Sequence, residues 1–115
     1  MALQFETRVV GKVAVVSCSG PIAFGEQATD LHIHSKEQLA DGRMVLLDLR
    51  AVPYLDSAGV GTLFAIYTST LTSHAKLALA GLTPRAREAL EISKLLSLVP
   101  AYADIEGALP ALRGA

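Results

Sequence analysis

Short apolar runs recur along the chain and indicate strands. Residues 3–10 and 12–17 predict two strands, and Gly11 between them predicts the turn that joins them. Residues 44–49 form a nearly continuous apolar run, which is typical of a strand covered on both faces. Two further short strands are expected at residues 76–80 and 99–102. We therefore expect a sheet of about four or five strands.

Segments with helical spacing of apolar residues separate these runs. The first covers residues 26–39, and the others begin at residues 57, 84 and 105. The longest should extend over residues 57–73, and its predicted buried stripe consists of Val60, Leu63, Phe64, Tyr67 and Leu71. Pro110, in the last helix, has no N–H group to donate, so we expect a kink or early fraying there.

The order of these elements predicts the fold class. Strands that alternate with helices of this length imply parallel crossovers, with the helices packed on the sheet. Residues 1–115 should form one compact α/β domain with a mixed, largely parallel sheet and about four helices. A chain of 115 residues with 51% hydrophobic and 18% charged residues has enough apolar surface for one buried core, which argues against disorder.

The charge balance narrows the choice of partners. Ten basic and 11 acidic residues give a formal net charge of −1, so nucleic-acid binding is not expected. The start of the sequence lacks the pattern of a signal peptide. The uncharged stretch between Asp56 and Lys76 is rich in Ser and Thr, which opposes membrane insertion. We expect a cytoplasmic protein that does not enter the membrane.

The common templates of nucleotide and thiol sites do not fit. The pair Gly59 and Gly61 lacks the third glycine of a dinucleotide loop, because Phe64 stands at that position. No Gly-Lys-Ser or Gly-Lys-Thr follows, so a phosphate loop is excluded as well. Cys18, the single cysteine, excludes an internal disulfide and is expected to be a buried, inert thiol.

The titratable residues do not form a recognisable catalytic or metal-binding set. His32 and His34 are two positions apart on a predicted helix, so they point in different directions, and we expect both to face solvent. Asp48 and Asp56 lie on different predicted elements, and no neighbour marks either carboxylate as an acid or a base. We therefore expect no catalytic residue, no metal and no cofactor.

The segment around Ser57 carries the clearest functional signal. Ser57 lies at or beside the N-cap of the long helix, where Ser57 and Asp56 can accept hydrogen bonds from free N–H groups. Capping leaves Gly59 and Gly61 unexplained, since each costs about 1 kcal/mol relative to Ala in a helix. The glycines indicate either tight packing against the sheet or a partner that approaches the backbone closely.

A helix start also favours negative charge. Phosphorylation of Ser57 would add about −1.5 to −2 charges at the positive end of the helix dipole, next to Asp56. The fold could tolerate this group, whereas a docked partner would be rejected. Two interpretations therefore stand at this point: Ser57 is a plain capping residue, or it is a phosphorylation switch.

One face of the same helix consists of small uncharged residues. They are Ala58, Thr62, Ala65, Ser69 and Thr72. Solvated helix faces usually carry Lys and Glu, so this stripe predicts a docking surface, with an oligomer contact or plain solvent exposure as alternatives. The predicted partner-binding set comprises Asp56, Ser57, Ala58, Gly59, Gly61, Thr62 and Ala65.

The order of motifs resembles the STAS domain family, the bacterial anti-sigma factor antagonists. That family has an apolar strand ending in Asp-Leu, then a short turn, then Asp-Ser-x-Gly at the start of a helix. Residues 45–49, 52–55 and 56–59 match these three parts in order and spacing. Gly20 and the segment 77–82, followed by Thr-Pro, also fit the family pattern.

The resemblance implies a small cytoplasmic regulator without catalytic activity. It implies that Ser57 is phosphorylated by an anti-sigma factor with serine kinase activity. The unphosphorylated domain then binds that partner and frees a sigma factor, the phosphorylated domain releases it, and a serine phosphatase resets the switch. One departure is Ala23, which stands where many members have an aspartate, and the nearest carboxylate in sequence is Glu26.

Three hypotheses follow from these observations. The first is a phosphorylation-controlled binding module, and the resemblance also extends to subunits of stress-signalling or lipid-transport complexes. The second is a nucleotide- or small-ligand-binding module that uses the same helix N-terminus. The third is a structural subunit, such as a homodimer, in which the uncharged face serves assembly.

Overall fold

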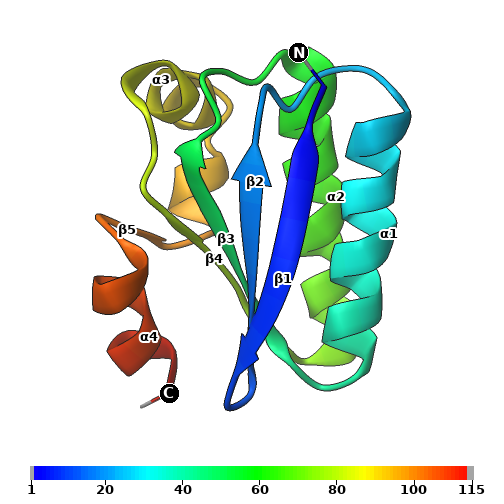
Figure 1. Ribbon diagram of the computed structural model, residues 1–115, viewed down its shortest axis with the longest axis vertical. Helices are drawn as coiled ribbons and strands as arrows, with labels where there is room; N and C mark the ends of the chain where they lie inside the picture. Colours follow the sequence, from blue (N-terminus) through cyan, green and yellow to red (C-terminus); the bar gives the residue numbers. More distant parts are fainter. Residues whose placement is uncertain (1, 114–115) are drawn as a thin grey trace.

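The computed structural model describes residues 2–113, which form one sheet with helices on both of its faces (Figure 1). The strands are β1 Gln4–Val10, β2 Val13–Ser19, β3 Met44–Ala51, β4 Leu77–Ala80 and β5 Ala101–Tyr102. The helices are α1 Glu26–Ala40, α2 Ser57–Ser73, α3 Pro84–Ile92 and α4 Ile105–Arg113, with a short 3-10 helix at Leu95–Ser97. The predicted α/β class with a five-stranded sheet and four α-helices is confirmed.

The sheet has the strand order β1-β2-β3-β4-β5. β1 is antiparallel to β2, and every later pair is parallel, so the sheet is mixed and largely parallel as predicted. Gly11, with φ 61°, lies in the tight turn between β1 and β2, where a residue with positive φ is needed. Because β1 stands at one end of the strand order, it is an edge strand that pairs only with β2.

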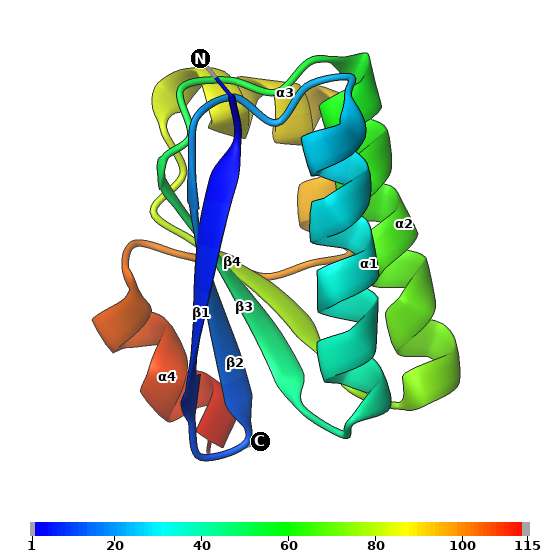
Figure 2. The ribbon, with the colours of Figure 1, turned by 45° about the vertical axis from the view of Figure 1, so that its right-hand side comes forward.

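The helices cover the two faces of the sheet unequally. α1 and α2 lie side by side on one face, and α4 lies on the other (Figures 1 and 2). The side chains of β3 alternate between the two sides, with Val45 and Leu47 in the larger core and Leu46 in the smaller core under α4. This burial on both faces explains the nearly continuous apolar run in the sequence.

The buried face of α2 agrees with the prediction in part. The buried residues are Gly59, Leu63, Ile66 and Thr70. Leu71, which was expected in the core, has 61% of its surface exposed. The prediction is otherwise confirmed, because Leu63 lies in the core and Val60, Phe64 and Tyr67 are partly buried against it. The hydroxyl of Thr70 donates to the Tyr67 carbonyl, which satisfies it in the buried position.

The last helix begins as predicted but does not end early. The Asp104 carboxylate accepts a hydrogen bond of 2.7 Å from the Gly107 amide, which satisfies a free N–H group of the first turn of α4. α4 then continues through Pro110 to Arg113, so the predicted early fraying is not seen.

None of the helices in residues 2–113 has the length and apolar character needed to cross a membrane.

Candidate functional site

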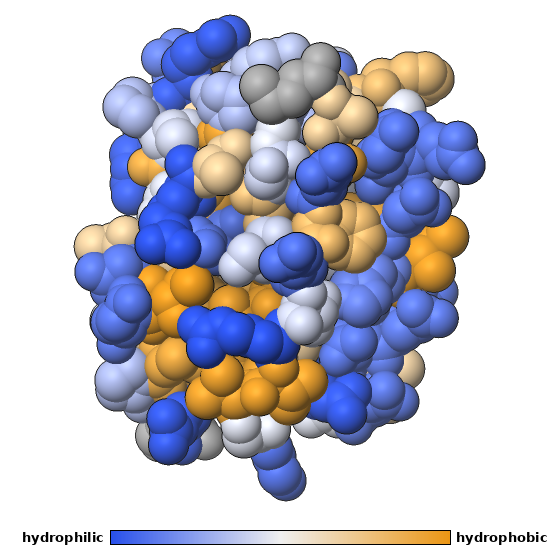
Figure 3. Space-filling view, in the orientation of Figure 1, coloured by the Kyte–Doolittle hydropathy of each residue, from blue (hydrophilic) through white to orange (hydrophobic). Residues whose placement is uncertain are grey.

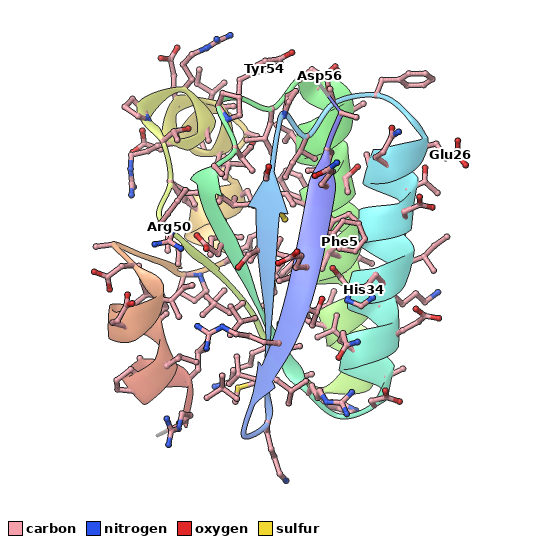
Figure 4. The ribbon with its side chains drawn as sticks, viewed as in Figure 1. Phe5, Glu26, His34, Arg50, Tyr54 and Asp56 are labelled. Carbon is pink, nitrogen blue, oxygen red and sulfur yellow. The ribbon has the colours of Figure 1, made fainter. Side chains whose placement is uncertain are left out.

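Asp56 and Ser57 occupy the two positions that open α2. Asp56 is the N-cap, and its Oδ1 accepts a hydrogen bond of 2.8 Å from the Gly59 amide. Its Oδ2 accepts a second one of 3.0 Å from the amide of Phe24, in the loop before α1. Asp56 therefore ties the start of α2 to the β2–α1 loop at one end of the domain (Figure 4).

These hydrogen bonds keep Asp56 ionised. The Phe24 amide, and then the Gly59 amide, lower the pKa of Asp56 below its ordinary value of 3.8. A carboxyl group whose pKa is lower in the folded state stabilises the fold above its unfolded pKa, and this stabilisation is lost as the pH falls through the folded pKa.

We expect Asp56→Asn to lower the free energy of unfolding at neutral pH by between about 0.3 and 1 kcal/mol. Asn retains an acceptor oxygen for the cap but lacks the charge that the helix dipole favours. The difference from wild type should shrink to zero as the pH falls below the folded pKa of Asp56. Urea denaturation at several pH values measures this. A difference that stays constant down to pH ~2 would contradict the assignment.

Ser57 is the first residue of α2, and it is exposed. Among the described residues its hydroxyl makes no hydrogen bond, because the capping is done by Asp56. The prediction left Ser57 at or beside the N-cap, and the structure places it one position inside. The hydroxyl is therefore open to a modifying enzyme and is not required for the cap.

The two glycines of α2 have different explanations. A Cβ atom on Gly59 would lie 1.8 Å from the carbonyl oxygen of Ile22, so only glycine fits. This close approach is tight packing, one of the two explanations offered by the sequence, but it is made against the loop after β2 and not against the sheet. A Cβ atom on Gly61 would meet nothing within 4 Å, and Gly61 is exposed. Packing within the described residues thus accounts for Gly59 but not for Gly61.

A shallow groove lies between the starts of α1 and α2. Its volume is about 350 Å³, and it is lined by Phe24, Gly25, Glu26, Ala28, Thr29, Ala58 and Thr62. Phe24 stands at its rim with 86% of its surface exposed. Ala58 and Thr62 of the predicted binding set contribute to the groove. Phe24 was not predicted, because a single aromatic residue in a loop gives no sign of whether it is buried.

Most of the stripe of small residues on α2 is not fully exposed. Ala58, Thr62, Ala65 and Ser69 are half-buried, and Thr72 is exposed. α2 packs against α1, and Ala58 and Thr62 lie beside the start of that helix. Small side chains allow the two helices to approach, which explains the absence of charge. Ala58 and Thr62, at the beginning of the stripe, line the groove, and docking at this end stays a prediction.

The comparison with protein families decides the identity of the fold. The family model described as STAS domain matches residues 4–108. The chain belongs to the STAS domain family. The match covers all five strands and reaches into α4, so the resemblance seen in the sequence motifs is confirmed.

Several proteins similar to this STAS domain are named as anti-sigma factor antagonists. It is 29% identical over 102 residues to BtrV of Bordetella bronchiseptica, named as a candidate anti-sigma factor antagonist, with 88% of each chain covered. An anti-sigma factor antagonist from Mycobacterium paratuberculosis is 25% identical, with a TM-score of 0.83 and coverage of 97% and 95%. The antagonist SpoIIAA in its unphosphorylated form has a TM-score of 0.82 at 17% identity, with coverage of 97% and 98%, a likeness in fold alone.

The resemblance places an aspartate in the loop before α1, and this chain has no carboxylate at that position. Ala23 takes that position, and Glu26 lies at the outer side of the start of α1, directed away from Asp56 (Figure 4). In this STAS domain the loop is instead held to α2 through the Phe24 amide. Among the described residues, Glu26 makes no side-chain hydrogen bond or ion pair with Asp56 or Ser57.

The histidines of this STAS domain give no metal site. His34 is half-buried on α1, where its Nε2 lies 2.6 Å from the Thr7 hydroxyl and its ring packs against Phe5 at 5.3 Å (Figure 4). The expectation that both histidines face solvent is therefore wrong for His34. Its side chain contacts the Thr7 hydroxyl and the Phe5 ring of β1. Within residues 2–113, no three His, Cys, Asp or Glu side chains gather as metal ligands.

Cys18 and Asp48 are both buried. Burial, together with the nearby charge of Asp48, raises the pKa of the Cys18 thiol to about 12, as expected for an inert buried thiol. Asp48 is buried on the face that α4 partly covers, where Arg50 lies 3.2 Å away and Ser17 donates a hydrogen bond of 3.3 Å. The two carboxylates Asp48 and Asp56 lie on separate elements, as predicted, and are not paired.

Proposed function

We propose that this STAS domain is an anti-sigma factor antagonist whose binding is switched off by phosphorylation of Ser57. The observation that carries the proposal is the exposed Ser57 hydroxyl at the first position of α2, left free because Asp56 supplies the cap. The similarity of the chain to BtrV and to the antagonist from Mycobacterium paratuberculosis supports this class of function. The domain acts as a substrate and a binding partner, not as a catalyst.

The partner we propose is an anti-sigma factor with serine kinase activity. The kinase transfers the terminal phosphoryl group of ATP to the Ser57 oxygen, ADP leaves, and the hydroxyl proton passes to a base of the kinase. The backbone N–H groups of the first turn favour the new negative charge, so the fold accepts the phosphate. A serine phosphatase then removes it. We propose that phosphorylation and dephosphorylation of Ser57 both take place in the cytoplasm.

The surface around Ser57 fits a protein partner. Phe24 offers an exposed aromatic side chain beside the groove, and aromatic residues are frequent anchors of interfaces. Gly61 lies one turn after Ser57 and leaves open space above the backbone of α2. A partner that contacts this surface meets Ser57 at its edge, so a phosphate there adds about −1.5 to −2 charges inside the interface.

Phosphate transfer tests the proposal directly. The purified domain is incubated with Mg-ATP and each serine-kinase anti-sigma factor of its own organism, and phosphopeptides are read by mass spectrometry. We expect one phosphate, on Ser57, and none on the Ser57→Ala variant. The matched control is Thr68→Ala, an exposed hydroxyl of the same helix, which should leave the phosphorylation unchanged. Phosphate at another residue, or none with any kinase, contradicts the proposal.

A further inference from the structure

In the described part of the chain, no helix or strand covers the outer edge of β1. β1 is seven residues long, pairs only with β2, and ends the sheet. Figure 2 looks onto this strand, and no helix lies in front of it. The opposite edge strand, β5, has only two residues. The described chain therefore presents one long, unpaired strand edge, and such an edge is a template for pairing with another strand.

Strand alternation shows which backbone groups point outward. The Lys12 carbonyl accepts a hydrogen bond of 2.8 Å from Met44, so the groups of Lys12 face β3. Backbone groups of successive residues in a strand point to opposite sides, so the N–H and C=O groups of Val13 face β1. Val10 is paired with Val13, and its backbone groups therefore face β2. Alternation along β1 then directs the N–H and C=O groups of Phe5, Thr7 and Val9 to the free edge.

The side chains of β1 carry opposite charges two positions apart. Glu6 and Arg8 are exposed and lie opposite Ser17 and Val15 of β2, on the sheet face that carries α4. Among the described residues neither takes part in an ion pair. On the other face, Val9 has 51% of its surface exposed at the same edge.

We propose that two copies of the chain dimerise by antiparallel pairing of their β1 edges around a two-fold axis at Thr7. Glu6 of each copy then lies opposite Arg8 of the other, and Phe5 lies opposite Val9. The outward backbone groups of Phe5, Thr7 and Val9 supply the hydrogen bonds. This assembly does not use Ser57, so it is independent of the proposed function.

The charges select this register. An axis at Glu6 would place two glutamates against each other, and an axis at Arg8 would place two arginines against each other, which is destabilising. Centring on Thr7 pairs all seven residues and makes both charge pairs favourable. A strand edge of this length gives a small interface, so the dimer should dissociate on dilution in roughly the micromolar range.

Charge exchange gives a sharp test by sedimentation velocity between about 1 µM and 1 mM. The wild type should shift from monomer to dimer as its concentration rises. Glu6→Arg and Arg8→Glu should each weaken self-association at least about tenfold, because each brings like charges together twice. An equimolar mixture of the two variants should form dimers again, since one chain then offers two cations and the other two anions. The double variant should also dimerise.

Matched controls are Glu91→Arg and Arg87→Glu, which make the same charge changes at exposed positions of α3 and should self-associate like the wild type. Circular dichroism verifies the fold of each variant, and recovery in the mixture shows independently that both chains are intact. A wild type that stays monomeric over the whole range overturns the proposal. A dimer that both single variants form as well as the wild type overturns it equally.

Discussion

Gly59→Ala is expected to lower the free energy of unfolding by about 3 kcal/mol. The added Cβ would lie 1.8 Å from the carbonyl oxygen of Ile22, and a main-chain atom cannot rotate away as a side chain can. Ile22 is fixed on both sides, since its amide donates to Tyr54 and its carbonyl accepts from Asp56. The start of α2 must therefore shift away from the β2–α1 loop. Chemical denaturation measures the loss.

Gly61→Ala is the matched comparison in the same helix. Its Cβ meets nothing within 4 Å, so the substitution should raise the free energy of unfolding by about 0.5 to 1 kcal/mol through helix propensity. The two substitutions add the same methyl group two residues apart and should have opposite effects. If Gly59→Ala is as stable as wild type, the close approach to Ile22 is not real.

Ser57→Asp is expected to weaken binding of the anti-sigma factor by roughly 100-fold, which corresponds to about 2.7 kcal/mol. The new carboxylate is placed beside the ionised Asp56 at the edge of the proposed interface, and a partner must bury or oppose both charges. Ser57→Ala should bind within about threefold of wild type, since the hydroxyl makes no described hydrogen bond. Calorimetric titration of each variant with the partner provides the two affinities.

The control for charge alone is Thr68→Asp. Thr68 is exposed on the same helix, 11 residues after Ser57, or about 16 Å along the axis at 1.5 Å per residue, beyond the Debye length at physiological salt. This variant should bind like wild type. If it loses as much affinity as Ser57→Asp, the effect is one of net charge, and the switch at Ser57 is wrong.

Periodicity predicted the elements well where the surroundings of a strand or helix are uniform. The run 44–49 became β3 because both faces of that strand are buried, and α3 begins at residue 84 as expected, with Pro84 at its first position and Thr83 as its cap. α2 was predicted with most of its inward residues, but Leu71 is exposed and Ile66 and Thr70 are buried instead. The orientation of α2 depends on its contacts with α1 and with the sheet, and no local pattern contains that information.

The capping chemistry at the start of α2 was predicted, but the neighbours of this segment in space were not. Asp56 and Ser57 were identified because capping and charge at a helix start follow from local sequence. The neighbour that makes Gly59 necessary is Ile22, which stands 37 positions earlier and meets α2 only through the fold. Phe24 and the contact of His34 with Thr7 are likewise tertiary, so sequence spacing did not reveal them.

The buried thiol of Cys18 has a practical consequence for spectroscopy. With its pKa raised to about 12, the side chain contains almost no thiolate at neutral pH and is shielded from reagents. A cysteine introduced at an exposed position would thus be the one group that a maleimide dye modifies in the native protein. Fluorescent labels could then report on distances and complexes without first replacing the natural residue, and so without leaving a void in the core.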